Sequence, residues 1–289
     1  MSKIREQTLS NGQTVAYRSR ADFDILAREL LDSDGMYLQH GIHLRDGDCI
    51  FDVGSNIGFF LLQLNRILAE GRVFCFEPIS DVFEVLQQNT ARHNHLEVTL
   101  HEVGLSRYDG SAEFTYFPRT SVASTMRPNS SAAYRRQSRL FVLAEMRNRG
   151  GFLAIVASFI PSWCLYPVTE LVRRYFQQSK RVSCRVCRLS TFLDEHPVNR
   201  IDLLKIDTEG AEEDVLAGIE PRHWLLVRQV VVEVHDGREG RARVERFLED
   251  KGFSVAGRQL MPDVEHLHVI YARRRHDGNS DSPSPDSLS

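Results

Sequence analysis

The sequence is poor in cysteine and tryptophan and has no excess of charge of one sign. Its 289 residues include five cysteines and two tryptophans, and the net charge is −3. An odd number of cysteines spread over this length does not form a disulfide framework, and the missing basic excess argues against nucleic acid as a partner. No second pair stands near Cys184 and Cys187 to complete a zinc site. We expect these two to be apolar strand residues.

Long apolar runs are also scarce. The first twenty residues, MSKIREQTLSNGQTVAYRSR, hold no apolar core of a secretory signal, so we expect a reducing, cytoplasmic location. The long uncharged run at 151–169 is near the lower length limit for a membrane-spanning helix and is divided by Pro161 and Pro167. Membrane contact through 151–169 is therefore not favoured.

Short runs rich in valine, isoleucine and phenylalanine alternate with helical patterns, which is typical of a parallel sheet with helices between its strands. The pattern predicts an α/β fold with a doubly wound, mostly parallel sheet. We expect an N-terminal helical segment at 1–48 and a core formed by 49–118 and 181–274. The alternation of apolar runs and helical patterns stops between the two parts of the core, which predicts a helical insertion at 119–180. The tail at 275–289 has no apolar anchor and is expected to be disordered.

The stretch FDVGSNIGFF, residues 51–60, follows the first predicted buried strand and carries two glycines four residues apart. A dinucleotide site favours G-x-G-x-x-G, with a pyrophosphate at the helix N-terminus. Here the pattern is D-x-G-x-x-x-G, and an anion gains nothing from the acid at Asp52. A ligand with an amine does gain from it. The turn therefore favours S-adenosylmethionine, which carries an ammonium beside a sulfonium.

The rest of the predicted cofactor site follows from the ends of neighbouring strands. Glu77 ends the second strand, where it can accept hydrogen bonds from both ribose hydroxyls. The end of the third strand is the expected place for adenine. Tyr37 and His40 could close over the cofactor, although ordinary packing is the stronger interpretation for both. The predicted cofactor-binding residues are Asp52, Gly54, Ser55, Asn56, Gly58, Glu77, Glu102, Val103 and Asp207.

Four segments, FDVGSNIGFF, FCFEP, LLKIDTEGAEEDVLAGI and RQVVVEVHD, resemble in order and spacing the FkbM family of S-adenosylmethionine-dependent methyltransferases. The similarity covers most of residues 36 to 273, and the K-I-D-x-E-G block is its most specific part. The segment VRQVVVEVHDG resembles most those members that are attached to, or work beside, polyketide and nonribosomal peptide assembly lines. The resemblance implies a class I, Rossmann-like fold with a seven-stranded sheet, and usually O-methylation. Residues 127–180 depart from the family pattern, so the acceptor is not carried over.

Two polar groups at predicted strand ends are candidates for catalysis. Lys205, Asp207 and Glu209 alternate along LLKIDTE, and Lys205 needs a charged partner if it is buried. Glu233 and His235 alternate along VVVEVHD in the same way. An imidazole titrates near neutrality, so we predict His235 as the general base, with Glu233 or Asp207 holding its tautomer. The structural alternative is a set of ion pairs at the entry to the next helices.

The same Asp207, Glu233 and His235 could instead hold a divalent metal that binds the acceptor oxygen. Nothing in their spacing demands a metal, so the prediction is a site without one.

The insertion at 119–180 allows three interpretations. We rank first a helical lid whose apolar residues line an acceptor pocket. A docking surface for a carrier protein, with Arg135, Arg136 and Arg139 facing an acidic partner, comes second. Membrane contact comes last.

The function predicted from all of this is O-methylation of a hydroxyl on a small or carrier-tethered natural product, with nitrogen or carboxylate acceptors still open. The alternatives are an NAD-linked oxidoreductase, disfavoured by the missing G-x-G, and a non-catalytic cofactor-binding scaffold.

Overall fold

The computed structural model describes residues 3–31, 35–93, 95–127, 170–171, 174–175, 178–259 and 267–275. Most of the predicted lid lies outside these ranges, as do the uncharged run at 151–169, the three arginines proposed for docking and nearly all of the predicted tail. Across the described ranges, no helix combines the length and apolar character needed to cross a membrane.

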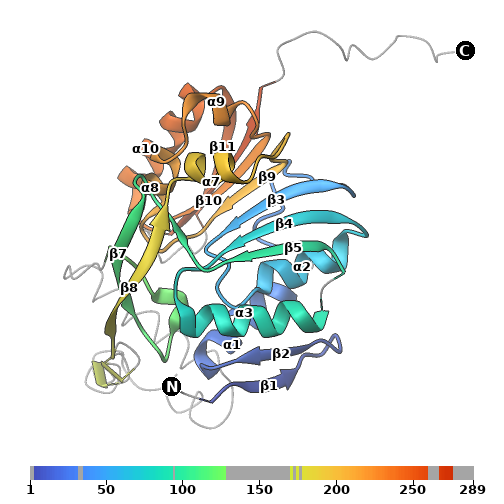
Figure 1. Ribbon diagram of the computed structural model, residues 1–289, viewed down its shortest axis with the longest axis vertical. Coiled ribbons are helices and arrows are strands. Elements are labelled where there is room, and N and C mark those ends of the chain that lie inside the picture. Colours follow the sequence, from blue (N-terminus) through green and yellow to red (C-terminus); the bar gives the residue numbers. More distant parts are fainter. Residues whose placement is uncertain are drawn as a thin grey trace, which may run out of the picture.

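The centre of the molecule is a seven-stranded sheet (Figure 1). Its strand order is β11-β12-β10-β9-β3-β4-β5, and every neighbouring pair is parallel except the two pairs that include β12. This confirms the predicted doubly wound, mostly parallel sheet. The strands are β3 (Asp48–Val53), β4 (Gly71–Phe76), β5 (Glu97–His101), β9 (Leu203–Ile206), β10 (Gln229–Val234), β11 (Phe253–Gln259) and β12 (His268–Arg274).

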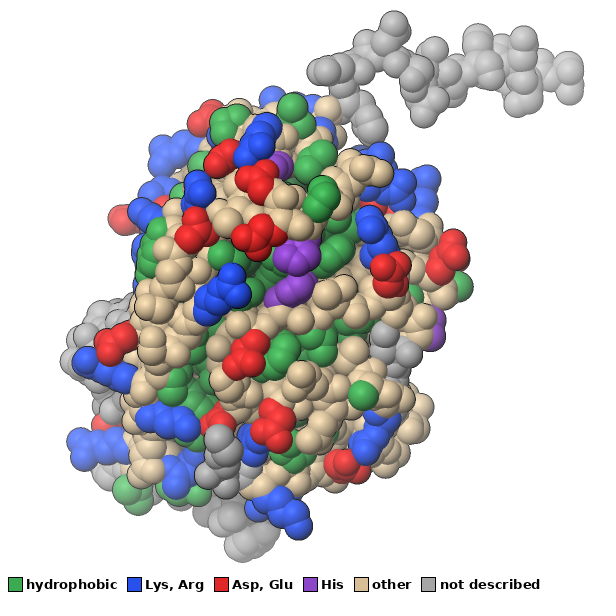
Figure 2. Space-filling view, viewed as in Figure 1, with side chains coloured by type: hydrophobic (Ala, Val, Ile, Leu, Met, Phe, Trp, Pro, Cys, Tyr) green, Lys and Arg blue, Asp and Glu red, His purple; other side chains and the backbone are tan. Residues whose placement is uncertain are grey.

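Helices cover both faces of this sheet because alternate strand residues point to opposite sides. Phe51 of β3 packs in one apolar cluster with Phe192 and Leu248, whereas its neighbour Ile50 packs in another with Leu61. The first face carries α7 (Leu189–Glu195), α8 (Glu212–Ala217), α9 (Pro221–Trp224) and α10 (Gly237–Asp250). The second carries α2 (Phe59–Ile67) and α3 (Ser80–His93). Acidic and basic side chains are interspersed over the face seen in Figure 2.

A second, smaller sheet lies beside the first. It has the order β6-β8-β7, with β6 (Gly104–Leu105), β7 (Gly110–Tyr116) and β8 (Lys180–Cys187), and a 3₁₀ turn (Ser121–Ala123) follows β7. β7 pairs with β8 and does not extend the large sheet. Cys184 and Cys187 are buried in β8, and burial raises the pKa of both thiols to about 11. They are the apolar strand residues that the sequence predicted.

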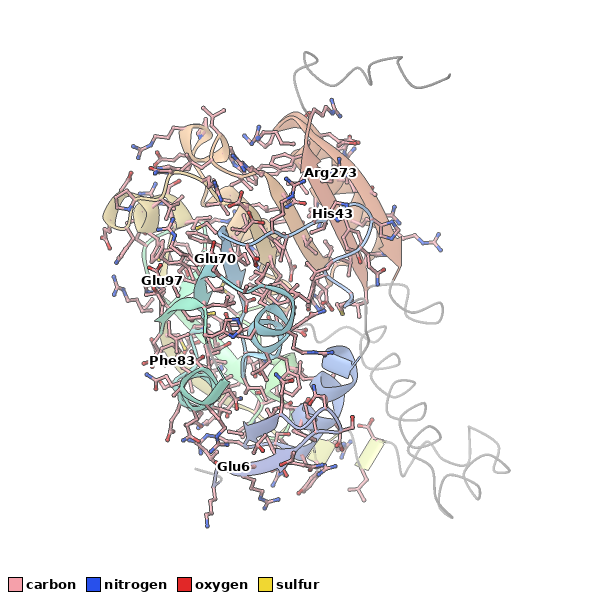
Figure 3. The ribbon with its side chains drawn as sticks, turned by 90° about the vertical axis from the view of Figure 1, so that its right-hand side faces the viewer. Glu6, His43, Glu70, Phe83, Glu97 and Arg273 are labelled. Atoms are coloured by element: carbon pink, nitrogen blue, oxygen red, sulfur yellow. The ribbon has the colours of Figure 1, made fainter. Side chains whose placement is uncertain are left out.

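The N-terminal segment corrects one prediction. Residues 1–48 were expected to be helical, but a hairpin of β1 (Arg5–Thr8) and β2 (Thr14–Tyr17) precedes the helix α1 (Arg20–Leu31). Its turn contains Asn11-Gly12, with Gly12 at φ +85°, which is the usual residue pair for a tight hairpin. The side-chain amide of Asn89 in α3 bonds both backbone groups of Ala16, so the hairpin lies against α3. Figure 3 places Glu6 of this hairpin and Arg273 of β12 toward opposite ends of the molecule.

Candidate active site

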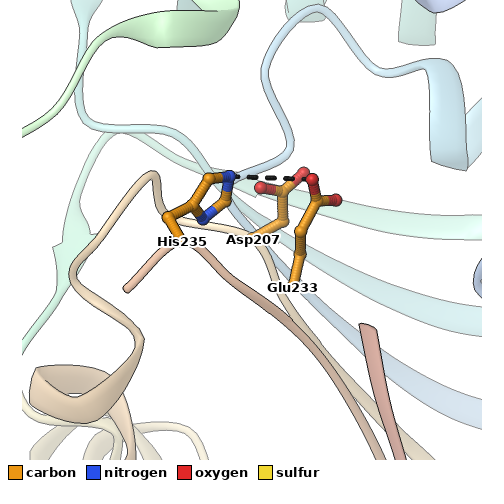
Figure 4. Close-up of side chains that lie close together, drawn as sticks. All are labelled: Asp207, Glu233 and His235. Atoms are coloured by element: carbon orange, nitrogen blue, oxygen red, sulfur yellow. Dashed lines mark ion pairs between the residues drawn. The ribbon is translucent and has the colours of Figure 1, made fainter. Parts of the chain in front are cut away.

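Three neighbouring strands of the large sheet change from apolar to polar on the same face as they reach their carboxyl ends. The apolar members are Ile50, Leu203 and Val231, and the buried polar members two positions later are Asp52, Lys205 and Glu233. Asp207 and His235 continue the series just past the ends of β9 and β10 (Figure 4). Ligands bind outside the carboxyl ends of strands in such sheets, so this edge is the candidate site.

Lys205 is the buried cation of this edge. Its Nζ lies 3.0 Å from Asp52 Oδ1 and 3.6 Å from Asp207 Oδ2, and it donates a hydrogen bond to the carbonyl of Gly54. Burial disfavours the charged ammonium, but Asp52 and Asp207 outweigh that effect and raise the pKa of Lys205 above its ordinary value. The prediction that a buried Lys205 is paired is confirmed. Asp52 has no exposed surface, so its first role is to balance this lysine.

The glycine turn packs directly on the end of β9. Gly54 has φ +80°, and a Cβ built on it would lie 1.8 Å from the carbonyl oxygen of Asp207. The amides of Gly54 and Ser55 both donate to the carbonyl of Phe76. Ser55 Oγ also donates to the carbonyl of Asp52 at 2.7 Å, so this buried hydroxyl holds the turn in place. The glycine turn therefore packs against the backbone of Asp207 and also forms part of the predicted cofactor site.

Asn56, a predicted cofactor-binding residue, shapes the turn before helix α2 and does not cap that helix. The helix begins at Phe59 with Gly58 as its N-cap, at φ +91°. Asn56 instead bends the turn with φ +47°, and its side-chain oxygen accepts a hydrogen bond from the amide of Ile57. The turn thus occupies the residues between Val53 at the end of β3 and Phe59 at the start of α2.

Glu77 lies just past the end of β4, where the sequence placed the ribose contact. Its carboxylate is buried and accepts hydrogen bonds from the amides of Ile79 (2.9 Å) and Asn56 (3.2 Å). Burial raises the pKa of Glu77 to about 7, against the lowering effect of these two bonds. A hydrogen bond therefore joins Glu77 to the glycine turn.

These residues fit S-adenosylmethionine. Asp52 is fully buried with Lys205 Nζ 3.0 Å from its Oδ1, and within the described part of the chain its Oδ2 has no hydrogen-bond donor. A positively charged ligand group near the turn would complete its pairing. Of the predicted adenine contacts, Val103 is buried, whereas Glu102 is exposed and accepts a bond from Ser80. Their contact with adenine stays a prediction.

Tyr37 belongs to the site, although packing was the stronger interpretation from sequence. Its ring is buried against Phe60, and its hydroxyl lies 3.0 Å from Asp207 Oδ2 and 3.2 Å from Glu233 Oε2. A buried tyrosine needs a partner for its hydroxyl, which is the signal that could have indicated this role. His40 instead packs its ring on Tyr271 of β12, at 4.7 Å between centroids.

His235 is surrounded by carboxylates. Its Nδ1 lies 3.0 Å from Glu212 Oε1, and its Nε2 lies 3.4 Å from Glu209 Oε2 and 3.6 Å from Glu233 Oε1. Burial acts to lower the pKa of the imidazole, but the three carboxylates outweigh it and hold the pKa well above its ordinary value. A raised pKa disfavours the neutral imidazole that a general base needs, and the role of His235 as general base stays a prediction.

Glu212 is a residue of this site that the sequence analysis missed. It is 3% exposed at the start of α8, and besides His235 it accepts a hydrogen bond from the amide of Gly210 at 2.8 Å. It therefore ties the loop after β9 to the imidazole that follows β10. Its position in DTEGAEED gave no sign of this, because contact with His235 depends on the pairing of β9 and β10.

Comparison with known proteins agrees with this geometry. Residues 52–255 match the model of the "Methyltransferase FkbM domain". The 31-O-demethyl-FK506 methyltransferase FkbM of Streptomyces tacrolimicus is 33% identical over 268 residues, which cover 92% of this chain and 95% of that protein. The AMB antimetabolite synthetase AmbE of Pseudomonas aeruginosa is 31% identical over 260 residues, 88% of this chain but 12% of the synthetase.

Among solved structures, a methyltransferase FkbM of Methylobacillus flagellatus KT is similar at 13% identity and a TM-score of 0.46, over 83% of this chain and 47% of that one. The sequence analysis considered NAD and S-adenosylmethionine as cofactors, and the family match supports S-adenosylmethionine. It also agrees with the resemblance carried by the glycine turn and the K-I-D-x-E-G block. The chain belongs to the FkbM family of S-adenosylmethionine-dependent methyltransferases.

Proposed function

We propose that this chain transfers the methyl group of S-adenosylmethionine to a hydroxyl oxygen of a natural-product intermediate. The observation that carries the proposal is the polar cluster of Tyr37, Asp207, Glu233 and His235, which lies beside the glycine turn. S-adenosylmethionine supplies a methyl group already activated by its positive sulfur. What the protein must add is the position of the acceptor and a place for its proton.

Asp207 is the residue we assign to the acceptor hydroxyl. Its side chain is 23% exposed, more than that of Glu233 at 11% or Lys205 at 4%. A carboxylate accepts a hydrogen bond from a hydroxyl and can take its proton as the oxygen attacks. Tyr37 and Lys205 contact the same carboxylate and hold it in place. They act on the reaction through Asp207.

The class of acceptor is proposed from the relatives. One similar protein is named as a methyltransferase for an oxygen of demethyl-FK506, and another is an antimetabolite synthetase. We therefore infer a hydroxyl on a natural product, either free or bound to a carrier protein. Both forms belong in an acceptor screen.

The test is transfer of labelled methyl from S-adenosylmethionine to a panel of hydroxylated natural products, free and carrier-bound. We expect a labelled product that survives alkaline hydrolysis, as a methyl ether does and a methyl ester does not. Asp207→Asn should lower kcat about 100-fold or more while binding of S-adenosylhomocysteine stays within a few-fold. Glu213→Gln is the matched control, because this acid of α8 pairs with Arg243 away from the cluster. Full activity of Asp207→Asn would overturn the assignment, and label only on nitrogen or in an ester would overturn the acceptor class.

Binding of the cofactor product should depend on pH through Glu77. Ribose hydroxyls donate to an ionised carboxylate, and the pKa of Glu77 is about 7 because the group is buried. If only the ionised form binds, the Kd for S-adenosylhomocysteine should rise about tenfold between pH 8 and pH 6. Titration calorimetry at the two pH values measures this. Glu77→Gln should bind weakly at both pH values with little change between them, and a wild-type Kd that is constant over this range would contradict the role.

A further inference from the structure

We propose that Asp207, Glu233 and His235 bind a divalent metal ion, and that this ion holds the acceptor oxygen. The role of the ion in holding the acceptor oxygen rests on the proposed function. Each of the three residues offers one ligand atom, and these atoms lie within 4.8 Å of one another (Figure 4). The sequence spacing alone gave no reason to expect a metal. The reason comes from the pairing of β9 with β10, which brings the three side chains together.

The distances fit an ion that is bound by oxygen and nitrogen. Metal–ligand bonds to these atoms are about 2.0–2.6 Å, so two ligands of one ion lie about 3 Å apart when adjacent and 4–5 Å apart when opposite. Nε2 of His235 stands 3.6 Å from Glu233 Oε1, close to the adjacent spacing. Small movements of these two side chains would bring the atoms from 3.6 Å to the adjacent spacing of about 3 Å.

The surroundings of the three residues provide the outer contacts that metal ligands usually have. A histidine bound to a metal through one ring nitrogen commonly donates from the other nitrogen to a carboxylate. Glu212, which is 3% exposed, lies 3.0 Å from Nδ1 of His235, so Nε2 is the nitrogen that faces Glu233. The hydroxyl of Tyr37 reaches both ligand carboxylates. Glu212 and Tyr37 would therefore orient all three ligands.

The charge of the side chains at and around the three ligands also favours a cation. Acidic groups outnumber basic groups there: the carboxylates are those of Asp52, Asp207, Glu209, Glu212 and Glu233, and the basic groups are those of Lys205 and His235. Most of these side chains are buried or half-buried, where unbalanced charge is costly. A divalent ion between the carboxylates offsets this excess.

Two carboxylates and one imidazole leave coordination positions for water and for an acceptor. Mixed oxygen and nitrogen ligands of this kind suit ions such as Mn²⁺, and less well ions that prefer oxygen alone. An acceptor hydroxyl bound to the ion would lose its proton more easily. The proton would still pass to Asp207, through the carboxylate oxygen that does not bind the ion.

The test uses the full chain after chelator treatment, with Mn²⁺ alone as the probe. Titration followed by the paramagnetic signal of free Mn²⁺ should show one site per chain with a Kd below about 100 μM, in the range of specific rather than incidental binding. Asp207→Asn and Glu233→Gln should each weaken binding at least tenfold, and Glu212→Gln by about 10- to 100-fold, as outer contacts of metal ligands do. Glu213→Gln should bind like the wild type.

S-adenosylhomocysteine binding and the thermal midpoint are measured on each variant, so that loss of the fold is recognised. A wild-type chain that binds S-adenosylhomocysteine but not Mn²⁺ would overturn the metal site and leave the proposed function intact. Mn²⁺ binding that is unchanged in folded Asp207→Asn and Glu233→Gln would overturn it as well. Methyl transfer that is equally fast before and after removal of the ion would count against its acceptor role, whereas Mn²⁺ binding without any methyl transfer would count against the proposed function.

Discussion

Replacing Lys205 with methionine should lower the free energy of unfolding by about 3–5 kcal/mol, because removal of one partner of a buried ion pair leaves the other charge uncompensated. The side chain of Lys205 is 4% exposed and that of Asp52 is fully buried, with 3.0 Å between the charged atoms. Urea unfolding followed by circular dichroism measures the change.

Two further variants separate this effect from loss of a lysine as such. Lys180→Met removes a half-exposed lysine that pairs with Asp81 at 3.1 Å, and it should cost under about 1 kcal/mol. The double variant Asp52→Asn with Lys205→Met removes both charges and should recover most of the lost stability. A loss below 1 kcal/mol for Lys205→Met alone would show that Asp52 finds another cation or takes up a proton.

Replacing Gly54 with alanine should cost about 2–5 kcal/mol and should weaken binding of S-adenosylhomocysteine at least tenfold. Part of the cost is the positive φ, about 1–2 kcal/mol, and the rest is the collision of the new Cβ with the carbonyl oxygen of Asp207. The turn or the end of β9 must move, and either movement disturbs the cofactor site.

The hairpin offers a matched control for this prediction. Gly12 has nearly the same φ, +85°, but nothing lies within 4 Å of a Cβ built there. Gly12→Ala should therefore lose only the cost of the backbone strain, with no effect on binding. If the two variants lost equal stability, the close approach of the turn to β9 would not be the reason for glycine at position 54.

Much of the fold could be predicted from the sequence because it depends on local pattern. Buried strands in a parallel sheet are continuous apolar runs, and the helices between them follow a 3.6-residue period. The ends of β9 and β10 could be located for the same reason: a lysine and acids within apolar runs have few stable places other than the end of a strand. This is why Asp207, Glu233 and His235 were identified before their contacts were known.

The remaining features depend on contacts between segments that are distant in the sequence. Tyr37 reaches the site from the segment before β3, and Glu212 reaches His235 only because β9 and β10 are neighbours. The raised pKa of His235 comes from Glu209 and Glu212 after β9 and from Glu233 in β10, and local sequence does not show that these groups meet. The hairpin at the N-terminus was missed because its two strands have four residues each, too few for a clear period.

The most direct test of the account is titration calorimetry of the purified chain with S-adenosylhomocysteine, repeated on Glu77→Ala. The account predicts micromolar binding at one site per chain, lost or weakened at least tenfold in the folded variant. This result would place the cofactor at the carboxyl ends of β3 and β4. A folded wild-type chain that does not bind S-adenosylhomocysteine, or a Glu77→Ala variant that binds it equally well, would contradict the site described here.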